Sequence, residues 1–138
     1  MIWLGKDLIF PDYSEVNEEG IIAIGGDLSP ERLILAYQKG IFPWFNEDDP
    51  IIWWFPTDRF VLFPENLYVS KSMKKVFKEQ LFTFTENKAF REVITNCSLV
   101  DRKGQDGTWI TNDMIEAYCE LNKRGIAKSI EVWQNDEL

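Results

Sequence analysis

The spacing of apolar and polar residues predicts a first segment, residues 1–58, built from short elements joined by turns. A helix is expected to begin after Ser29, whose hydroxyl suits an N-cap, because Pro30 follows it, and to end at Gly40. The apolar residues between these points repeat at helical spacing and are expected to share one face: Leu33, Ala36 and Tyr37.

Two aromatic runs, residues 41–45 and 51–56, follow that helix and enclose an acidic turn. Each run contains a proline, which restricts the residue before it to extended backbone and cannot donate a backbone hydrogen bond. We therefore expect strands or ordered loops here rather than helix.

From residue 59 the pattern changes to strands that alternate with helices. Strands are predicted at residues 60–63, 82–85 and 129–133, and helices after Ser70, after Asn87 and from Thr111 or Asn112. Each of the last two helices has an apolar face that is expected to point into the protein core. In the helix after Asn87 the face consists of Phe90, Val93, Ile94 and Cys97, and in the helix from Thr111 or Asn112 it consists of Met114, Ile115, Tyr118 and Leu121. A loop containing Asp101, Gly104, Asp106 and Gly107 joins these two helices. The whole pattern predicts an α+β fold.

Residues 134–137 are predicted to form a hairpin turn directly after the last strand. A returning strand would be expected to follow, and without it the last strand would have an unpaired edge. The pattern is therefore typical of the front part of a longer protein. Edge-strand pairing with a second copy is also expected.

Composition limits the possible chemistry. The 138 residues include no His, which excludes an imidazole base or metal ligand. Cys97 and Cys119 lack metal-binding spacing and are expected to be free, buried or part-buried thiols of a reducing compartment. We expect no metal, no cofactor, no signal peptide and no membrane span, and hence a cytoplasmic protein.

Charge is divided unevenly along the chain. Residues 1–58 hold eleven acidic and three basic residues, a net charge of −8, whereas residues 59–138 balance to zero. The predicted helix after Ser70 gathers its lysines within an arc of about 100°, opposite its apolar residues: Lys71, Lys74, Lys75 and Lys78. Such a face is either solvated or a contact for the phosphates of a nucleic acid.

Four tryptophans are candidate binding residues. Trp53 and Trp54 are adjacent, so at least one of them is expected in the core, whereas Trp44 and Trp109 suit either the core or the rim of a pocket that stacks a base. The loop at residues 25–27 is a weak phosphate-loop candidate and fits a turn before a helix better. No Ser, Cys or carboxylate pair has the spacing of a nucleophile or an acid–base couple.

The chain resembles a known family, the leucyl/phenylalanyl-tRNA–protein transferases. The motifs that carry the resemblance cover nearly all of the chain: GGDLSPERL (25–33), AYQKGIFPWF (36–45), PIIWW (50–54), SKSMKK (70–75), GTWIT (107–111), MIEAY (114–118) and SIEVW (129–133).

The resemblance implies an enzyme that transfers Leu or Phe from aminoacyl-tRNA to the N-terminal Arg or Lys of an acceptor protein and so marks it for degradation. It implies a small N-terminal α+β domain, residues 1–58, and the first part of an acetyltransferase-like (GNAT-type) domain, residues 59–138. Trp44 and Trp109 match substrate-binding tryptophans, and the matches to tRNA-binding lysines are Lys71, Lys75 and Lys78. The family's catalytic groups are expected beyond Leu138, so no catalytic residue is assigned within this chain, which is expected to be inactive alone.

Two other functions stay open from the sequence. The chain could be a non-catalytic module that binds RNA ends, which the lysine-rich helix favours. Alternatively, its Trp-rich segment could bind a carbohydrate or a protein partner.

Overall fold

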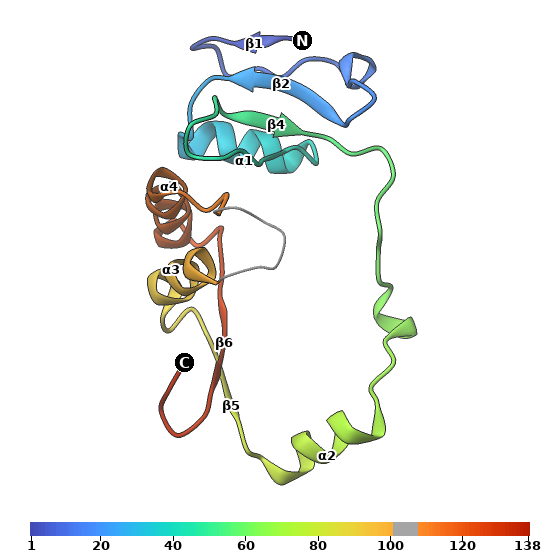
Figure 1. Cartoon of the computed structure of the whole chain (residues 1–138), viewed down its shortest axis with the longest axis vertical. Helices are drawn as coiled ribbons and strands as arrows, with labels where there is room; N and C mark the ends of the chain where they lie inside the picture. Colours follow the sequence, from blue (N-terminus) through green and yellow to red (C-terminus); the bar gives the residue numbers. More distant parts are fainter. Residues whose placement is uncertain (101–107) are drawn as a thin grey trace.

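The computed structural model describes residues 1–100 and 108–138 and has the predicted α+β composition (Figure 1). Its N-terminal sheet has the strand order β1-β2-β4-β3. The strands are β1 (Trp3–Leu4), β2 (Ile21–Gly25), β3 (Phe42–Pro43) and β4 (Ile52–Trp54). β1 pairs with β2 in parallel, and the other neighbours are antiparallel. The two aromatic runs therefore contain the extended strands β3 and β4, as their prolines predict.

Helix α1 (Pro30–Gln38) lies beside this sheet and has the predicted ends. The Ser29 side chain accepts a hydrogen bond from the Arg32 amide at 3.4 Å, and Gly40 follows the helix at φ +69°. That positive φ favours glycine because other residues there bring Cβ too close to the backbone. Local capping rules thus specify α1.

The core beneath α1 contains Leu33, Ala36 and Trp53, all fully buried. The Trp53 indole nitrogen donates to the Gly25 carbonyl at 2.9 Å, so the one polar atom of this large side chain is satisfied. The prediction that at least one of the paired tryptophans is buried is confirmed. The Gly25 and Gly26 amides donate to backbone carbonyls, which supports a turn there rather than a phosphate loop.

Within residues 59–100 and 108–138, the structure has three α-helices and a two-stranded antiparallel sheet. Their bounds are α2 (Lys71–Glu79), β5 (Thr83–Glu86), α3 (Phe90–Leu99), α4 (Asn112–Lys123) and β6 (Ile130–Trp133). Ser70 caps α2 and Thr111 caps α4, each accepting from the amide three residues on. After β6, Asn135 and Asp136 take positive φ values of 53° and 65°, which confirms the predicted hairpin turn.

The two parts of the chain share a core where α4 meets α1. Leu121 of α4 is buried in the same cluster as Leu33 and Trp53. On the surface, the Arg124 guanidinium donates to the Glu31 carboxylate at 2.7 Å, which joins the end of α4 to the start of α1. These contacts fix α4, and the site it helps to form, on the N-terminal sheet.

Two local predictions are wrong. Residues 60–63 form no strand: all four side chains are exposed, and a short 3-10 helix, Pro64–Asn66, follows them. No strand among residues 1–100 and 108–138 pairs with this segment, so its β propensity has no ladder to join. Asn87 does not cap α3 either; it adopts φ +56°, and its side chain instead accepts from the Ser129 amide at 3.0 Å.

Other expectations have mixed outcomes. Cys119 is buried, but Cys97 is exposed, so the prediction of a buried or part-buried thiol is wrong for Cys97. The residues predicted in the loop before Thr108, namely Asp101, Gly104, Asp106 and Gly107, lie outside the described residues. No helix in the described part of the chain is long and apolar enough to cross a bilayer.

Candidate functional site

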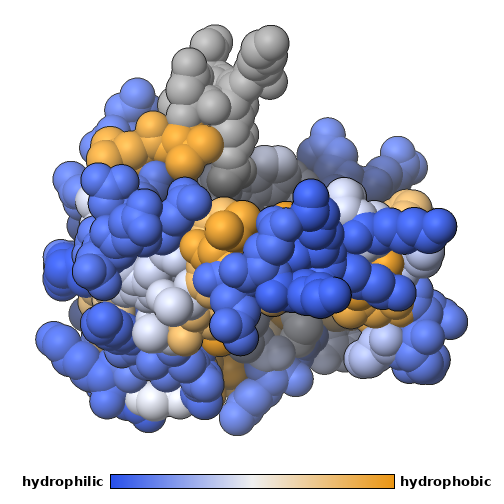
Figure 2. All heavy atoms as spheres, turned by 90° about the horizontal axis from the view of Figure 1, so that it is seen from below, coloured by the Kyte–Doolittle hydropathy of each residue, from blue (hydrophilic) through white to orange (hydrophobic). Residues whose placement is uncertain are grey.

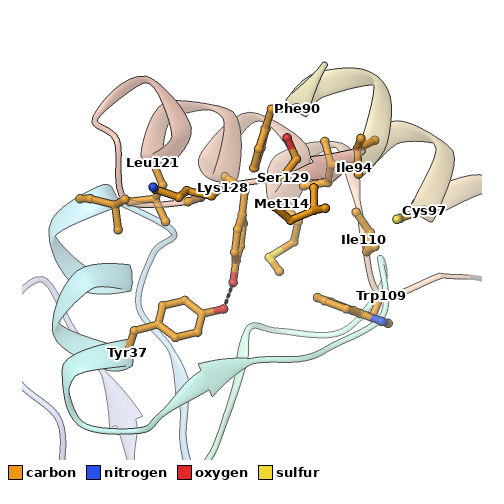
Figure 3. A pocket seen from close by; sticks show the side chains of 15 residues that line it. Tyr37, Phe90, Ile94, Cys97, Trp109, Ile110, Met114, Leu121, Lys128 and Ser129 are labelled. Atoms are coloured by element: carbon orange, nitrogen blue, oxygen red, sulfur yellow. Dashed lines mark hydrogen bonds between the residues drawn. The ribbon is translucent and has the colours of Figure 1, made fainter. Parts of the chain in front are cut away.

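A mainly apolar cavity of about 580 Å³ lies between α1, α3, α4 and the start of β6 (Figure 3). Its walls combine aliphatic and aromatic side chains with sulfur. Residues that line it include Phe90, Val93, Ile94 and Cys97 of α3, Met114, Tyr118 and Leu121 of α4, and Tyr37 of α1. Because aliphatic and aromatic walls favour apolar groups, the cavity suits a hydrophobic side chain.

The predicted apolar stripes explain the cavity. The α4 stripe buries Met114, Ile115 and Leu121, as expected for a core face. The corresponding stripe of α3 has no fully buried residue and instead forms a cavity wall. Helical periodicity therefore identified the apolar face of α3 correctly, but the face borders a hollow rather than a closed core.

Trp109 lies on the cavity wall, just before Ile110, which is itself buried (Figure 3). The Ile110 amide donates to the Thr108 hydroxyl at 3.1 Å, which orders the short segment that leads into α4. Of the two places that the sequence left open for Trp109, the core or the rim of a pocket, the side chain occupies the wall of the cavity.

Tyr37 and Tyr118 place two hydroxyl groups in this apolar surrounding, and the hydroxyls hydrogen-bond to each other (Figure 3). Burial raises the pKa of both side chains further above the ordinary tyrosine value, at which the hydroxyl is already protonated at neutral pH. Their sequence positions did not indicate a binding role for either tyrosine. Both tyrosines belong to predicted apolar helix faces. A tyrosine on each of two such faces was the one sequence feature that could have indicated a polar pair in the site.

Lys128 is the charged residue on the cavity lining. Its ammonium donates to the Glu86 carboxylate at 2.7 Å, and this hydrogen bond raises the pKa of Lys128. The side chains of both residues are more than half exposed. The ion pair thus lies at the solvent side of the site.

A buried carboxylate lies next to two walls of the cavity and bonds to residues beside them. Glu131 of β6 is 1% exposed, and its carboxylate accepts hydrogen bonds from the Thr85 and Ser129 hydroxyls and the Ala89 amide. Burial alone would raise the pKa of Glu131, but these hydrogen bonds outweigh it and lower the pKa to about 2. We call Glu131 with Thr85, Ala89 and Ser129 the carboxylate frame.

Trp44 lies apart from the cavity lining. It directly follows β3 and is 46% exposed, with its ring centroid 5.3 Å from that of Trp54. The Trp54 indole donates to the Trp44 carbonyl at 2.7 Å. Trp44 is thus held at the sheet surface with an open face, while Trp109 lies at the cavity.

The predicted tRNA-binding lysines lie on α2, at the end of the β5–β6 sheet away from α4 (Figure 1). No residue of α2 is buried, and Lys71, Lys75 and Lys78 are exposed. Viewed from that end, the surface is dominated by hydrophilic side chains with apolar patches between them (Figure 2). The structure therefore brings Trp109 to the cavity and places the lysines on a separate surface, and the roles of all these residues stay predictions.

Among residues 1–100 and 108–138, no group of three acidic or Cys side chains is arranged to hold a metal ion.

Comparison with known proteins finds two family models that match consecutive parts of the chain. The model described as "Leucyl/phenylalanyl-tRNA protein transferase N-terminal domain" matches residues 26–57. The model described as "Leucyl/phenylalanyl-tRNA protein transferase" matches residues 61–138, more than half of the chain.

Curated relatives carry the same description, "Leucyl/phenylalanyl-tRNA--protein transferase". The chain is 62% identical to the protein of Flavobacterium johnsoniae and 56% identical to that of Flavobacterium psychrophilum, in both cases over all 138 residues. It is 50% identical to the protein of Saccharophagus degradans, again over its whole length. The chain spans 65% of the length of the two Flavobacterium proteins and 58% of the third.

Proposed function

Because the chain belongs to the leucyl/phenylalanyl-tRNA protein transferase family, we propose that it holds the aminoacyl end of a tRNA for an aminoacyltransferase. The proposed reaction moves Leu or Phe from aminoacyl-tRNA to the N-terminal Arg or Lys of an acceptor protein and so marks that protein for degradation in the cytoplasm. The single observation that carries the proposal is the apolar cavity bordered by Trp109 in a chain of this family.

The cavity is the proposed pocket for the Leu or Phe side chain. Its aliphatic and aromatic walls reward burial of an apolar group and penalise a charged one, which would lose its hydration there. The paired hydroxyls of Tyr37 and Tyr118 provide polar atoms that can orient the ester or the α-amino group of the bound amino acid. Discrimination between amino acids of similar shape would follow from the fit to these walls.

Trp44 and Trp109 are the proposed contacts for the 3′-terminal adenosine and the aminoacyl group. Trp109 is supported by its place on the cavity wall, and Trp44 by its exposed ring, which is available to stack a base. Such stacking contributes roughly 1–3 kcal/mol per base.

Lys71, Lys75 and Lys78 are the proposed contacts for the tRNA backbone. All three lie on α2, whose apolar residues Val76 and Phe77 face β5 and leave the lysines toward solvent. Ammonium groups on one helix face suit phosphates without selecting a sequence, which fits recognition of different tRNAs.

The proposed chemistry needs little bond activation from this part of the protein. An aminoacyl ester is already activated. A free α-amine attacks its carbonyl carbon and forms the peptide bond as the bond to the ribose oxygen breaks, and the proton lost by the amine leaves that oxygen as a ribose hydroxyl. Holding the two groups in contact supplies roughly 7–11 kcal/mol of the barrier reduction. We assign no catalytic residue within residues 1–138 and propose that these residues bind the aminoacyl end without catalysing transfer.

The proposal extends to the fold. Residues 59–138 are proposed to form the first part of an acetyltransferase-like, GNAT-type domain, and residues 1–58 the small N-terminal domain that packs against it. The positions of the two family-model matches, 26–57 and 61–138, support this division.

A binding experiment tests the cavity directly. The probes are non-hydrolysable amides of 3′-amino-3′-deoxyadenosine with Leu or Phe, compared with the Glu amide by titration calorimetry. We expect the Leu and Phe amides to bind and the Glu amide not to bind. Val93→Trp, which fills the cavity from α3, should abolish binding, whereas Val100→Trp, at an exposed valine beyond α3, should not. Equal binding of all three amides would refute the proposed pocket.

A transfer assay tests the rest. Labelled Leu on Leu-tRNA is offered to an Arg-initiated peptide with residues 1–138 as the only protein. We expect no peptide labelling, and robust labelling would contradict the proposal that these residues only bind. If tRNA binds but the adenosine amides do not, the chain is instead a module for RNA ends, the alternative that the α2 lysines favour.

A further inference from the structure

Glu131 caps a helix that has no cap of its own. The residue before α3, Ala89, offers no side-chain hydrogen bond to the first turn. The Glu131 carboxylate reaches across from β6 and accepts the Ala89 amide at 3.2 Å. A negative charge at this end of a helix is also favoured by the helix dipole. The start of α3 is therefore held by a residue that is remote in the sequence.

The same carboxylate holds both strands of the small sheet. It accepts the Ser129 hydroxyl on one oxygen and the Thr85 hydroxyl on the other, both at 2.5 Å. The Thr85 oxygen in turn accepts the Trp133 indole at 2.7 Å, so its proton is directed to Glu131. A glutamine side chain at this position would have an NH2 group in place of one carboxylate oxygen. In either orientation that NH2 group would face at least one of the groups that now donate to Glu131.

The carboxylate frame links two walls of the cavity. Ala89 directly precedes Phe90, which lines the cavity from α3, and Ser129 and Ile130 line it from β6 immediately before Glu131. The α3 wall thus begins one residue after Ala89, which bonds to the carboxylate, and the β6 wall ends one residue before Glu131. The frame therefore fixes where the α3 wall stands relative to the β6 wall.

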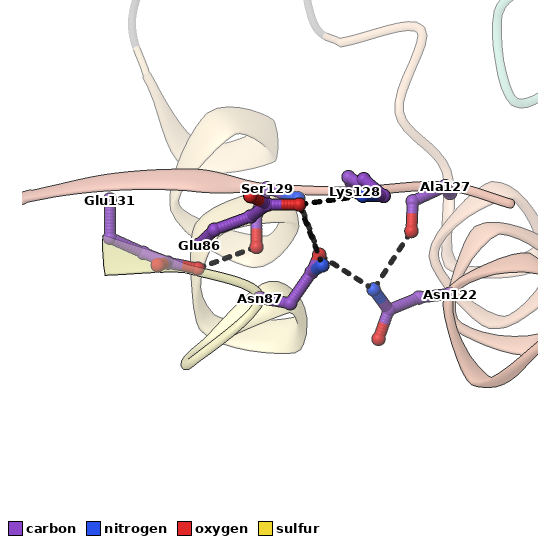
Figure 4. Close-up of polar contacts among 7 residues, drawn as sticks. All are labelled: Glu86, Asn87, Asn122, Ala127, Lys128, Ser129 and Glu131. Carbon is purple, nitrogen blue, oxygen red and sulfur yellow. Dashed lines mark hydrogen bonds and ion pairs between the residues drawn. The ribbon is translucent and has the colours of Figure 1, made fainter. Parts of the chain in front are cut away.

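A second brace fixes the third wall (Figure 4). The Asn87 side-chain oxygen accepts the Ser129 amide at 3.0 Å and the Asn122 amide group at 3.2 Å. Asn122, near the end of α4, also donates to the Ala127 carbonyl at 2.9 Å. The Arg91 guanidinium of α3 also donates to the Glu116 carboxylate of α4 at 2.6 and 2.8 Å. A change at the carboxylate frame is therefore expected to move the start of α3 relative to the β6 wall.

We propose that Glu131 is a positioning residue that sets the width of the apolar cavity and thereby the preference between Leu and Phe. This inference rests on the proposed function, because it takes the cavity as the pocket for the transferred side chain. The two side chains differ in shape and volume, and a misfit of one methylene group changes selection by roughly 10- to 200-fold. A small shift of the α3 wall is therefore enough to change the preference.

The test compares Glu131→Gln with Glu137→Gln. Glu137 lies in the hairpin turn after β6, is exposed and is not among the residues that line the cavity, so the same chemical change there is the matched control. The first measurement is amide hydrogen exchange, followed residue by residue. We expect amide exchange at Ala89 and at residues 93–95 to be about tenfold faster in Glu131→Gln, with the α4 amides unchanged. The reason is that a neutral amide oxygen accepts the Ala89 amide less strongly than the carboxylate does, which loosens the first bonds of the helix.

The second measurement is the ratio of the dissociation constants of the Leu and Phe adenosine amides. A variant that is merely less stable weakens both amides by the same factor and leaves the ratio unchanged. We expect Glu131→Gln to change the ratio by about tenfold and Glu137→Gln to leave it unchanged.

Three results would overturn the inference. Unchanged exchange at Ala89 and at residues 93–95 would show that Glu131 does not hold α3. Faster exchange with an unchanged ratio would show that the frame does not set specificity. If the wild-type chain binds neither amide, the proposed pocket itself is wrong, and the assignment of specificity to Glu131 fails with it.

Discussion

The hydroxyl pair of Tyr37 and Tyr118 leads to a prediction of non-additive mutations. Tyr118 is partly buried, so Tyr37→Phe leaves its hydroxyl without a partner in an apolar surrounding. An unpaired buried polar group costs about 1–3 kcal/mol. Tyr37 is 49% exposed, and its hydroxyl can turn to water after Tyr118→Phe, so that change should cost only about 0.5–1 kcal/mol.

The double variant removes both partners and leaves no orphaned hydroxyl. We therefore expect it to be no less stable than Tyr37→Phe alone, with a coupling energy of about 1 kcal/mol. Urea unfolding followed by tryptophan fluorescence measures each stability from the midpoint and slope. Tyr13→Phe is the control for a lost tyrosine hydroxyl, because Tyr13 makes only a long, exposed hydrogen bond to the Lys39 carbonyl. Losses that simply add in the double variant would refute the assignment of this pair as a coupled unit.

Three further predictions follow from other contacts. The association constant of tRNA falls as salt concentration rises, and changing Lys71, Lys75 and Lys78 to Gln should make the slope of log K against log salt less steep by about 2–3, at ~0.9 per lost phosphate contact. The control Lys6→Gln should leave the slope unchanged. Gly26→Ala should cost about 2 kcal/mol in urea unfolding, because Gly26 has φ +76° and a Cβ there would lie 3.1 Å from the Arg32 side chain; Gly5→Ala, with open space around it, should stay within about 0.5 kcal/mol. The lowered pKa of Glu131, about 2, gives stability that is present above the unfolded pKa near 4.5 and is lost as pH falls from there toward 2. Acid titration of Glu131→Gln should therefore lack that part of the loss, and an acid transition identical to the wild type would contradict it.

Local rules made α1, α2 and α4 predictable from the sequence. Ser29, Ser70 and Thr111 each cap the helix that follows, and such a cap depends only on residues within one turn. The turn after β6 was predictable for the same reason. The helical spacing of apolar residues also identified the apolar faces of α3 and α4.

Features that depend on residues far apart in the sequence could not be predicted. Glu131 looked like an ordinary strand residue, and only the fold brings Thr85 and Ala89 to its carboxylate. Tyr37 and Tyr118 are 81 positions apart and meet because α4 packs on α1. Residues 60–63 have the composition of a strand, but composition does not supply a partner strand.

The burial of Leu121 beside Leu33 and Trp53 has a consequence for how this protein unfolds. The two family models meet between residues 57 and 61, yet the apolar cluster draws side chains from both sides of that boundary. Withdrawing α4 would expose the N-terminal cluster to water, so its loss of structure costs free energy in both segments at once. The two segments that the family models match separately are therefore expected to unfold together, in one cooperative transition.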